Sequence, residues 1–232
     1  MKTINVLNVP DFRKPDGSWG KFYSEVTDDD CRLSMHTRAA VLWNNLKSRC
    51  REGSAQRKNS TSYVQIENHF DNYDVFTEWC QGQYGYMNKS ASGIYWNLDK
   101  DLLHHGNKIY SPDTCMFIPL SVNTVMMASD VCRGKFPVGV QPHYQVKKTR
   151  YTATCRRRDG SGYVGIYDTP EEAHKAWQLA KVDRILEEAS DHPEHIKMYE
   201  ALMWHIDRIR NDYENDRETK VEWWTDRGLT IQ

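Results

Sequence analysis

The chain has 232 residues, of which 39% are hydrophobic and 27% charged, and its formal net charge at pH 7 is −1. That length is enough for one large domain or for two to three small ones. Its apolar runs stay well short of the roughly 18 residues that a membrane span needs, so we expect no membrane partner.

The N-terminus and the cysteines bear on the compartment. The first residues lack the basic and then apolar pattern of a signal peptide, which predicts a cytoplasmic protein. The six cysteines, at positions 31, 50, 80, 115, 132 and 155, include no close pair. This spacing argues against a zinc site and favours reduced, mostly buried thiols.

The charge is segregated along the chain although the total is near zero. Residues 133–165 contain eight Lys and Arg against one acid, a net charge of +7, whereas residues 186–232 contain six Lys and Arg against twelve acids, a net charge of −6. This asymmetry favours a nucleic-acid contact surface in the middle of the chain and a solvated tail that faces a partner. The alternative is that both segments are ordinary solvated surface.

The N-terminal part predicts helices joined by irregular chain. Residues 1–30 contain Pro and Gly breakers, and the acidic run at 28–30 is a helix-start signal. Apolar spacing predicts helices over residues 36–50 and 72–82, with a polar loop over 51–62 between them.

The segment from residue 94 to residue 127 predicts a strand, a long polar loop, a second strand and a short helix. The strands are expected over 94–103 and 114–119, and the helix over 121–127. Acidic and amide side chains stand at the end of the first strand and in the helix, at Asp99, Asp101 and Asn123. Hard oxygen ligands of this kind suit a divalent metal, Mg²⁺ or Mn²⁺, and such ions serve phosphate chemistry.

This unit resembles the ββα-metal nucleases of the HNH family. The resemblance implies that Asp99 and Asn123 are metal ligands, that Lys100 stands at the position of the general base, and that Thr114 stands at the position of the residue that orients the base. Residues 35–125 are also similar to bacteriophage proteins labelled HNH endonucleases, through the string from Trp96 to Leu103 and the following Gly-Asn-Lys-x-Tyr-Ser-Pro-x-Thr-Cys.

The general base is left open by the sequence. A charged lysine cannot take a proton unless its pKa is lowered, so the alternatives to Lys100 are His104, His105, or Asp101 acting through a water. A purely structural interpretation also stands, in which residues 99–101 form a salt-bridged strand end and Asn107 is a turn residue.

After residue 133 the pattern predicts three short strands and then helices. The strands are expected over 138–140, 150–157 and 162–167. A helix start follows at 168–172, where Thr, Pro and two Glu stand in order; Pro193 breaks that helix, and a second helix is expected over 194–213.

Residues 136–185 resemble an AP2/ERF-type DNA-binding domain. The shared features are a Gly-Val opening, an aromatic-x-Ala strand, a Gly-x-Tyr strand and a Thr-x-Glu-Glu-Ala helix start. The resemblance implies a three-stranded antiparallel sheet that lies in the major groove of double-stranded DNA, with one helix behind it. With Lys108 added from the loop of the nuclease-like unit, the expected DNA contacts are Gln141, His143, Lys147, Lys148, Arg150, Thr152, Arg156, Arg157 and Arg158.

Together these patterns predict an α+β protein in four parts. The parts are a mainly helical region over 1–89, an HNH-like ββα-metal unit over 90–132, an AP2-like module over 133–190 and an acidic helical tail over 191–232. The function we expect is metal-dependent hydrolysis of DNA phosphodiester bonds, in the bacterial host cytoplasm if the protein is phage-encoded. A non-catalytic DNA-binding protein with a degenerate HNH unit is the main alternative, and a protein-interaction factor acting through the tail is a third. The sequence leaves open whether the protein is a monomer or a homodimer.

Overall fold

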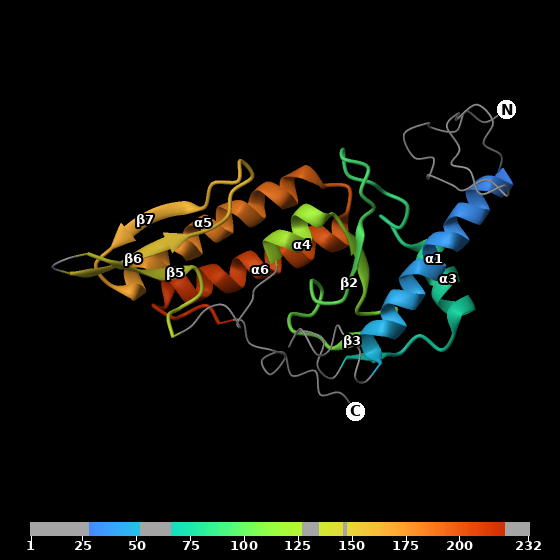
Figure 1. Cartoon of the computed structure of the whole chain (residues 1–232), viewed down its shortest axis with the longest axis horizontal. Coiled ribbons are helices and arrows are strands. Elements are labelled where there is room, and N and C mark those ends of the chain that lie inside the picture. The colour runs from blue at the N-terminus through green and yellow to red at the C-terminus, as the bar shows by residue number, and fades with distance from the viewer. Residues whose placement is uncertain (1–27, 52–65, 127–134, 146–147, 221–232) are drawn as a thin grey trace. The chain divides into compact units, whose positions relative to one another are not determined.

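The computed structural model describes residues 28–51, 66–126, 135–145 and 148–220 (Figure 1). Most of the irregular segment expected over 1–30, most of the loop expected over 51–62, and Lys147 lie outside the described residues. The chain divides into two compact units, one formed by residues 1–101 and 107–120 and the other by residues 102–106 and 121–232. The helices of the described ranges are all too short or too polar to cross a membrane.

Two helices form one side of the core of the first unit. Helix α1 (Asp28–Cys50) begins at the acidic run, eight residues before the start expected from apolar spacing. Helix α3 (Tyr73–Gly82) begins after Asn72, whose side chain accepts a hydrogen bond from the Val75 backbone N–H at 3.0 Å. This cap satisfies an N–H group that has no partner within the helix. Aromatic rings then join the helices, with the centroids of Trp43 and Phe76 5.3 Å apart.

Short strands form the rest of the first unit. Strands β2 (Asn97–Asp99) and β4 (Met116–Ile118) pair in the antiparallel sense, with Asp99 opposite Met116. Strand β4 is buried along its whole length, which agrees with the apolar run that predicted it. Strands β1 (Glu67–Asn68) and β3 (Ile109–Tyr110) form a parallel pair that the sequence did not predict, because two residues carry no readable period.

The second unit contains a three-stranded antiparallel sheet in the order β5 (Val140–Tyr144), β6 (Thr149–Thr154) and β7 (Tyr163–Tyr167). Helix α5 (Pro170–Asp191) covers one face of this sheet, and the core between them consists of Val140, Ala153, Cys155, Ala173 and Trp177. A capping box starts α5, since the Thr169 side chain accepts from the Glu172 N–H and the Glu172 carboxylate accepts from the Thr169 N–H. Helices α4 (Leu120–Met126) and α6 (Ile196–Glu214) complete the described elements.

The α+β fold class is therefore confirmed. The expected strand–loop–strand–helix order is present as β2, β4 and α4, with the short strand β3 added inside the loop. The expected three strands and two helices after residue 133 are present as β5, β6, β7, α5 and α6, but β5 begins at Val140, where the first expected strand ended. The division into four parts stays a prediction.

Cys50, Cys80, Cys115 and Cys155 are free thiols, as the sequence predicted. Burial raises the pKa of the Cys80 and Cys115 thiols to about 12. These thiols are therefore protonated at neutral pH and serve as small apolar groups of the core.

Candidate functional site

The β5–β7 sheet has one covered face and one outward face. Side chains of a strand alternate between the two faces, and residues directly opposite each other on paired strands share a face. Val140 is opposite Ala153, and both are buried against α5. The next positions along the strands therefore point away from α5.

The outward face brings together four of the predicted DNA contacts. The register places Gln141 opposite Thr152 and His143 opposite Arg150. Gln141 and His143 are exposed, and Arg150 and Thr152 are partly exposed. The face thus carries a polar surface of amide, imidazole, hydroxyl and guanidinium groups on two neighbouring strands.

A carboxylate that the sequence analysis treated only as part of a helix start lies beside this face. Asp168 follows β7, and its Oδ1 lies 2.9 Å from Nε of Arg150 and 3.0 Å from Nζ of Lys148. Lys148, and then Arg150, lower the pKa of Asp168 below its usual value. The sequence did carry a signal for this contact: an acid follows β7 directly, and β7 pairs with a strand that carries basic residues.

The three consecutive arginines after β6 have different surroundings. Arg156 and Arg157 are exposed in the turn that leads to β7. Arg158 instead forms ion pairs with acids of α5, at 2.5 Å to Asp191 and 3.5 Å to Glu188. Its guanidinium is therefore bound to the helix, and we leave Arg158 out of the DNA-contact set proposed below.

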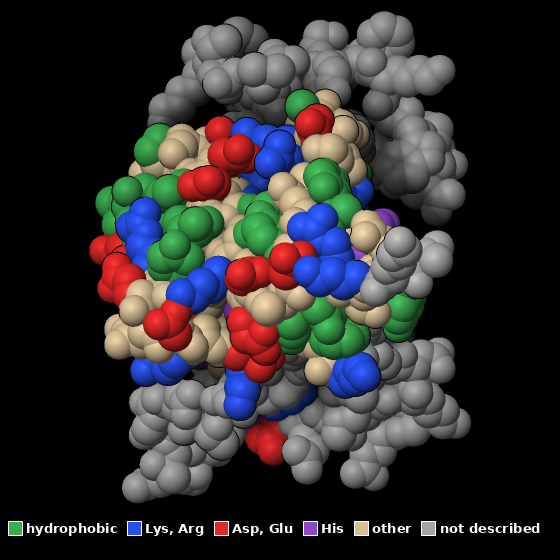
Figure 2. Space-filling view, turned by 90° about the vertical axis from the view of Figure 1, so that its left-hand side faces the viewer, with side chains coloured by type: hydrophobic (Ala, Val, Ile, Leu, Met, Phe, Trp, Pro, Cys, Tyr) green, Lys and Arg blue, Asp and Glu red, His purple; other side chains and the backbone are tan. Residues whose placement is uncertain are grey.

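The surface view agrees with this mixture of charges. Figure 2 looks onto the end of the second unit that carries the sheet and shows Lys and Arg side chains interspersed with Asp and Glu. The basic character of residues 133–165 is thus partly offset in space by Asp168, which follows β7, and by acids of α5. Among the described residues, a ligand of this surface therefore contacts single Lys and Arg side chains set among acids, and not one continuous basic patch.

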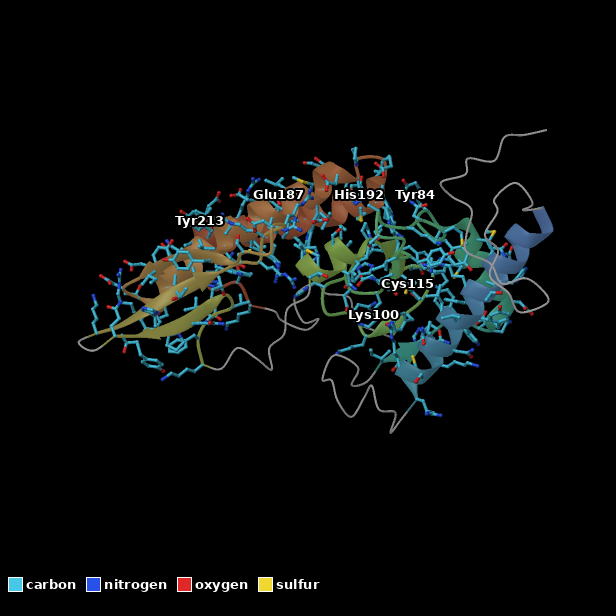
Figure 3. The ribbon with its side chains drawn as sticks, turned by 45° about the horizontal axis from the view of Figure 1, so that its top comes forward. Tyr84, Lys100, Cys115, Glu187, His192 and Tyr213 are labelled. Carbon is cyan, nitrogen blue, oxygen red and sulfur yellow. The ribbon has the colours of Figure 1, made fainter. Side chains whose placement is uncertain are left out.

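The second candidate site is the loop after β2, where Lys100 is labelled in Figure 3. The Lys100 side chain is only 4% exposed, and its Nζ lies 2.6 Å from Oδ1 of Asp101. The other oxygen-bearing side chain, Asp99, accepts the Asp101 backbone N–H on Oδ2 at 2.7 Å. The predicted strand to residue 103 therefore ends at Asp99, because the backbone turns there onto that carboxylate.

The buried Asn107 side chain links the two sides of this loop by hydrogen bonds. Its side chain is 1% exposed, and its Nδ2 donates to the carbonyl oxygens of Lys100 at 2.9 Å and Ile109 at 2.6 Å. Its Oδ1 accepts the Ile109 N–H at 2.9 Å. Asn107 is therefore a buried bridge across the loop and fixes the backbone on which the Lys100 side chain stands.

We expect Asn107→Ala to destabilise this loop by about 2–4 kcal/mol, because the change leaves buried backbone groups without their partners. Hydrogen exchange of the amides of residues 97–118 measures the effect. Asn44→Ala is the control, since Asn44 is exposed on α1. Equal exchange rates in the two variants would contradict the bridging role.

Thr114, the expected orienting residue, is used by the loop itself. Its Oγ1 donates to the Ile109 carbonyl at 2.7 Å and accepts the Ser111 N–H at 3.1 Å. Nearby, burial and then the charge of Lys100 lower the pKa of Lys108. The surroundings of Lys100 thus combine a second cation with hydroxyl groups that are already hydrogen-bonded.

The remaining predicted site residues belong to the second unit. Asn123 lies in α4, and His104 and His105 lie in the 102–106 segment. That segment contacts α6, where the His205 ring lies 5.6 Å from the His105 ring and His205 Nε2 lies 3.1 Å from the Leu102 carbonyl oxygen.

The end of β2 carries two acids that bear on the binding of a divalent metal. Asp99 and Asp101 supply hard carboxylate oxygens of the type that Mg²⁺ prefers. However, the Asp101 carboxylate is paired with the Lys100 ammonium. Within the described ranges, no three His, Cys, Asp or Glu side chains gather in a way that could hold a metal ion. The carboxylate donors of this turn are therefore of the right type for Mg²⁺, and Asp99 is the one at the position where the HNH-like pattern carries a metal ligand.

Comparison of the chain with protein-family models, curated proteins and solved structures finds no match.

Proposed function

We propose that the protein is a DNA endonuclease that binds double-stranded DNA through the outward face of the β5–β7 sheet and cleaves it with Mg²⁺ or Mn²⁺ at an HNH-like unit beginning at β2. The observation that carries the proposal is the outward face itself, where the strand register sets Gln141, His143, Arg150 and Thr152 side by side opposite the helix-covered core. In this proposal the sheet and α5 form an AP2-like module.

A sheet of this kind suits duplex DNA. A narrow β-ribbon fits the major groove, where amide, hydroxyl and guanidinium groups distinguish base edges. Gln141 and Thr152 lie in the middle of the face and would meet bases. Arg156, Arg157 and Lys148 lie at the ends of the strands and would meet phosphates, which makes the affinity fall as salt rises.

The proposed cleavage rests on the order of elements and on the acids that end β2. The bound metal would stabilise negative charge on the scissile phosphate and the leaving oxygen. Asp99 is the residue of the first unit that we assign to holding it. The residue that would take the proton of the attacking water stays open among Lys100, His104 and His105.

The second candidate is a DNA-binding protein without catalysis. The observation that favours it is the ion pair between the buried Lys100 and the partly exposed Asp101, at the position where the HNH family carries its base. A cation held there disfavours the approach of a metal ion as well as the acceptance of a proton. Both candidates use the same DNA-binding face.

One experiment separates these candidates. The full chain is incubated with supercoiled plasmid and Mg²⁺ or Mn²⁺, and binding to the same DNA is measured in EDTA. We expect nicking that EDTA abolishes and that Asp99→Ala reduces by about a thousandfold or more, the order of loss expected for a catalytic charge contact. Asp113→Ala is the matched control, because Asp113 is an exposed acid of the same loop. Binding without nicking would establish the non-catalytic candidate, and absence of binding would overturn both.

A further inference from the structure

We propose that Asp168 is a positioning residue that holds the Arg150 guanidinium for recognition of a guanine edge, and so sets the sequence discrimination of the DNA-binding face. The inference rests on the proposed DNA binding and goes beyond it by assigning discrimination to one carboxylate–guanidinium pair. It does not depend on cleavage.

The Arg150 side chain is held at two points. Its Nε donates to Oδ1 of Asp168 at 2.9 Å, and its Nη2 donates to the carbonyl oxygen of Ile166 at 3.3 Å. Ile166 is on β7, directly opposite Thr152. One contact is to a side chain and the other to the backbone of the neighbouring strand, so together they fix both the place and the plane of the guanidinium.

The fixed guanidinium keeps donors for a ligand. The Arg150 side chain is 35% exposed and stands opposite the exposed His143 on the outward face. Within the described part of the chain, its structural bonds use Nε and one N–H of Nη2, which leaves Nη1 and the second N–H of Nη2. These donors form the end of the planar fork, which matches the O6 and N7 acceptors of guanine.

Lys148 has a different relation to the same carboxylate. Its Nζ lies 3.0 Å from the same Oδ1 of Asp168, and its side chain is 56% exposed. A lysine ammonium is a point charge on a flexible stem, so it suits a phosphate better than a base edge. Loss of Asp168 would therefore release two cations of different character, a mobile arginine and a lysine free to follow the DNA backbone.

The role of Asp168 in folding is expected to be small. Its carboxylate is about half exposed, and ion pairs in such surroundings contribute little to stability because water screens them. The capping box of α5 uses the Thr169 hydroxyl and the Glu172 carboxylate, so it does not depend on the Asp168 side chain. A purely structural role for Asp168 would consequently leave the DNA sequence preference unchanged.

The test is selection of binding sites from a random duplex pool by the full chain in EDTA. The variants are Asp168→Asn, Arg150→Lys, Lys148→Gln and the control Asp159→Asn. Asp159 is an exposed acid of the same module that accepts the Ser161 N–H at 2.8 Å, a bond that asparagine can keep. Thermal melting of each variant shows that it is folded.

We expect the wild type to select a site with at least one strongly preferred guanine. Asp168→Asn and Arg150→Lys should both lose the preference at that position, by about tenfold, the discrimination typical of a bidentate arginine–guanine contact, and keep the others. Asp168→Asn should also bind unrelated DNA more tightly and with a steeper dependence on salt, because Lys148 is released to a phosphate. Lys148→Gln should keep the guanine preference while binding all sequences more weakly, because it loses only a phosphate contact, and Asp159→Asn should behave as the wild type.

Two outcomes overturn the inference while leaving DNA binding in place. One is a wild type that binds duplex DNA without preference, and the other is an Asp168→Asn protein that selects the wild-type site with unchanged discrimination. A folded wild type that binds no duplex DNA removes the proposed function itself, and the inference with it.

Discussion

Replacement of Gly139 by alanine should unfold the sheet-and-helix core of the second unit. Gly139 has a φ of 78°, and a Cβ built on it would lie 2.0 Å from Cδ1 of Trp177. The indole has little room to retreat, since it is 7% exposed and stacks on the His174 ring with centroids 5.3 Å apart. Backbone strain and overpacking together predict a loss of about 3–5 kcal/mol.

Gly160 provides a matched control for this prediction. It has a φ of 84°, but a Cβ at its position would meet no atom within 4 Å. Gly160→Ala should therefore show only the backbone strain, about 1–2 kcal/mol. Hydrogen exchange of the amides in β5–β7, measured for both variants, separates the two contributions. Similar exchange rates would mean that the contact with Trp177 does not limit this core.

The architecture of the second unit was readable from its sequence because each signal there is local. The helix start at Thr169 uses residues close in sequence, and β5 and β6 alternate apolar and polar positions over five or six residues. The side on which Trp177 packs follows from the apolar spacing of α5. For such elements, local chemistry and tertiary packing agree.

The charged contacts of the same unit could not be predicted. Whether Arg158 meets DNA or α5 depends on where the helix ends in space, and the structure places it against Asp191, more than thirty positions away in the chain. Likewise, Arg150 meets Asp168 across two strands. The sequence supplied the net charge of the segment, whereas the partner of each cation required the register and the helix position.

In the loop after β2, too, the local elements could be predicted and the long-range contacts could not. The two strands and the helix that surround it were predicted in the right order, but β3 was not, because it exists only through parallel pairing with β1. The buried position of Asn107 also could not be read from its surroundings in sequence, which are polar and turn-like. Its three hydrogen bonds explain why a polar side chain is buried there.

The second large effect is expected at Glu188 of α5. Its side chain is 1% exposed and pairs with Nη2 of Arg184 one turn earlier on the helix, and Arg158 approaches the same Oε1 at 3.5 Å. Loss of the carboxylate would leave the Arg184 charge buried, with Glu187 at 3.2 Å as its remaining acidic partner. We therefore expect Glu188→Leu to destabilise the second unit by about 3–5 kcal/mol, measured by hydrogen exchange of the α5 amides.

The compensating variant tests whether the cost comes from the uncompensated charge or from lost packing. In Glu188→Leu with Arg184→Met, both buried charges are replaced by apolar groups, so most of the lost stability should return. Asp183→Asn is the control at an exposed acid of the same helix and should change stability by less than about 0.5 kcal/mol. If the double variant is as unstable as the sum of its single changes, the pair is not coupled, and the cost of Glu188→Leu must be assigned to packing.

The same double variant also constrains the role of Arg158. Without Glu188, Arg158 keeps Asp191 and Glu187 of α5 as partners, at 2.5 Å and 3.5 Å. Two acids still hold the guanidinium, so the affinity for DNA and its salt dependence should match those of the wild type once the core is restored. A clearly steeper salt dependence in the double variant would mean that Arg158 had been released to a phosphate, and it would return this arginine to the DNA-contact set.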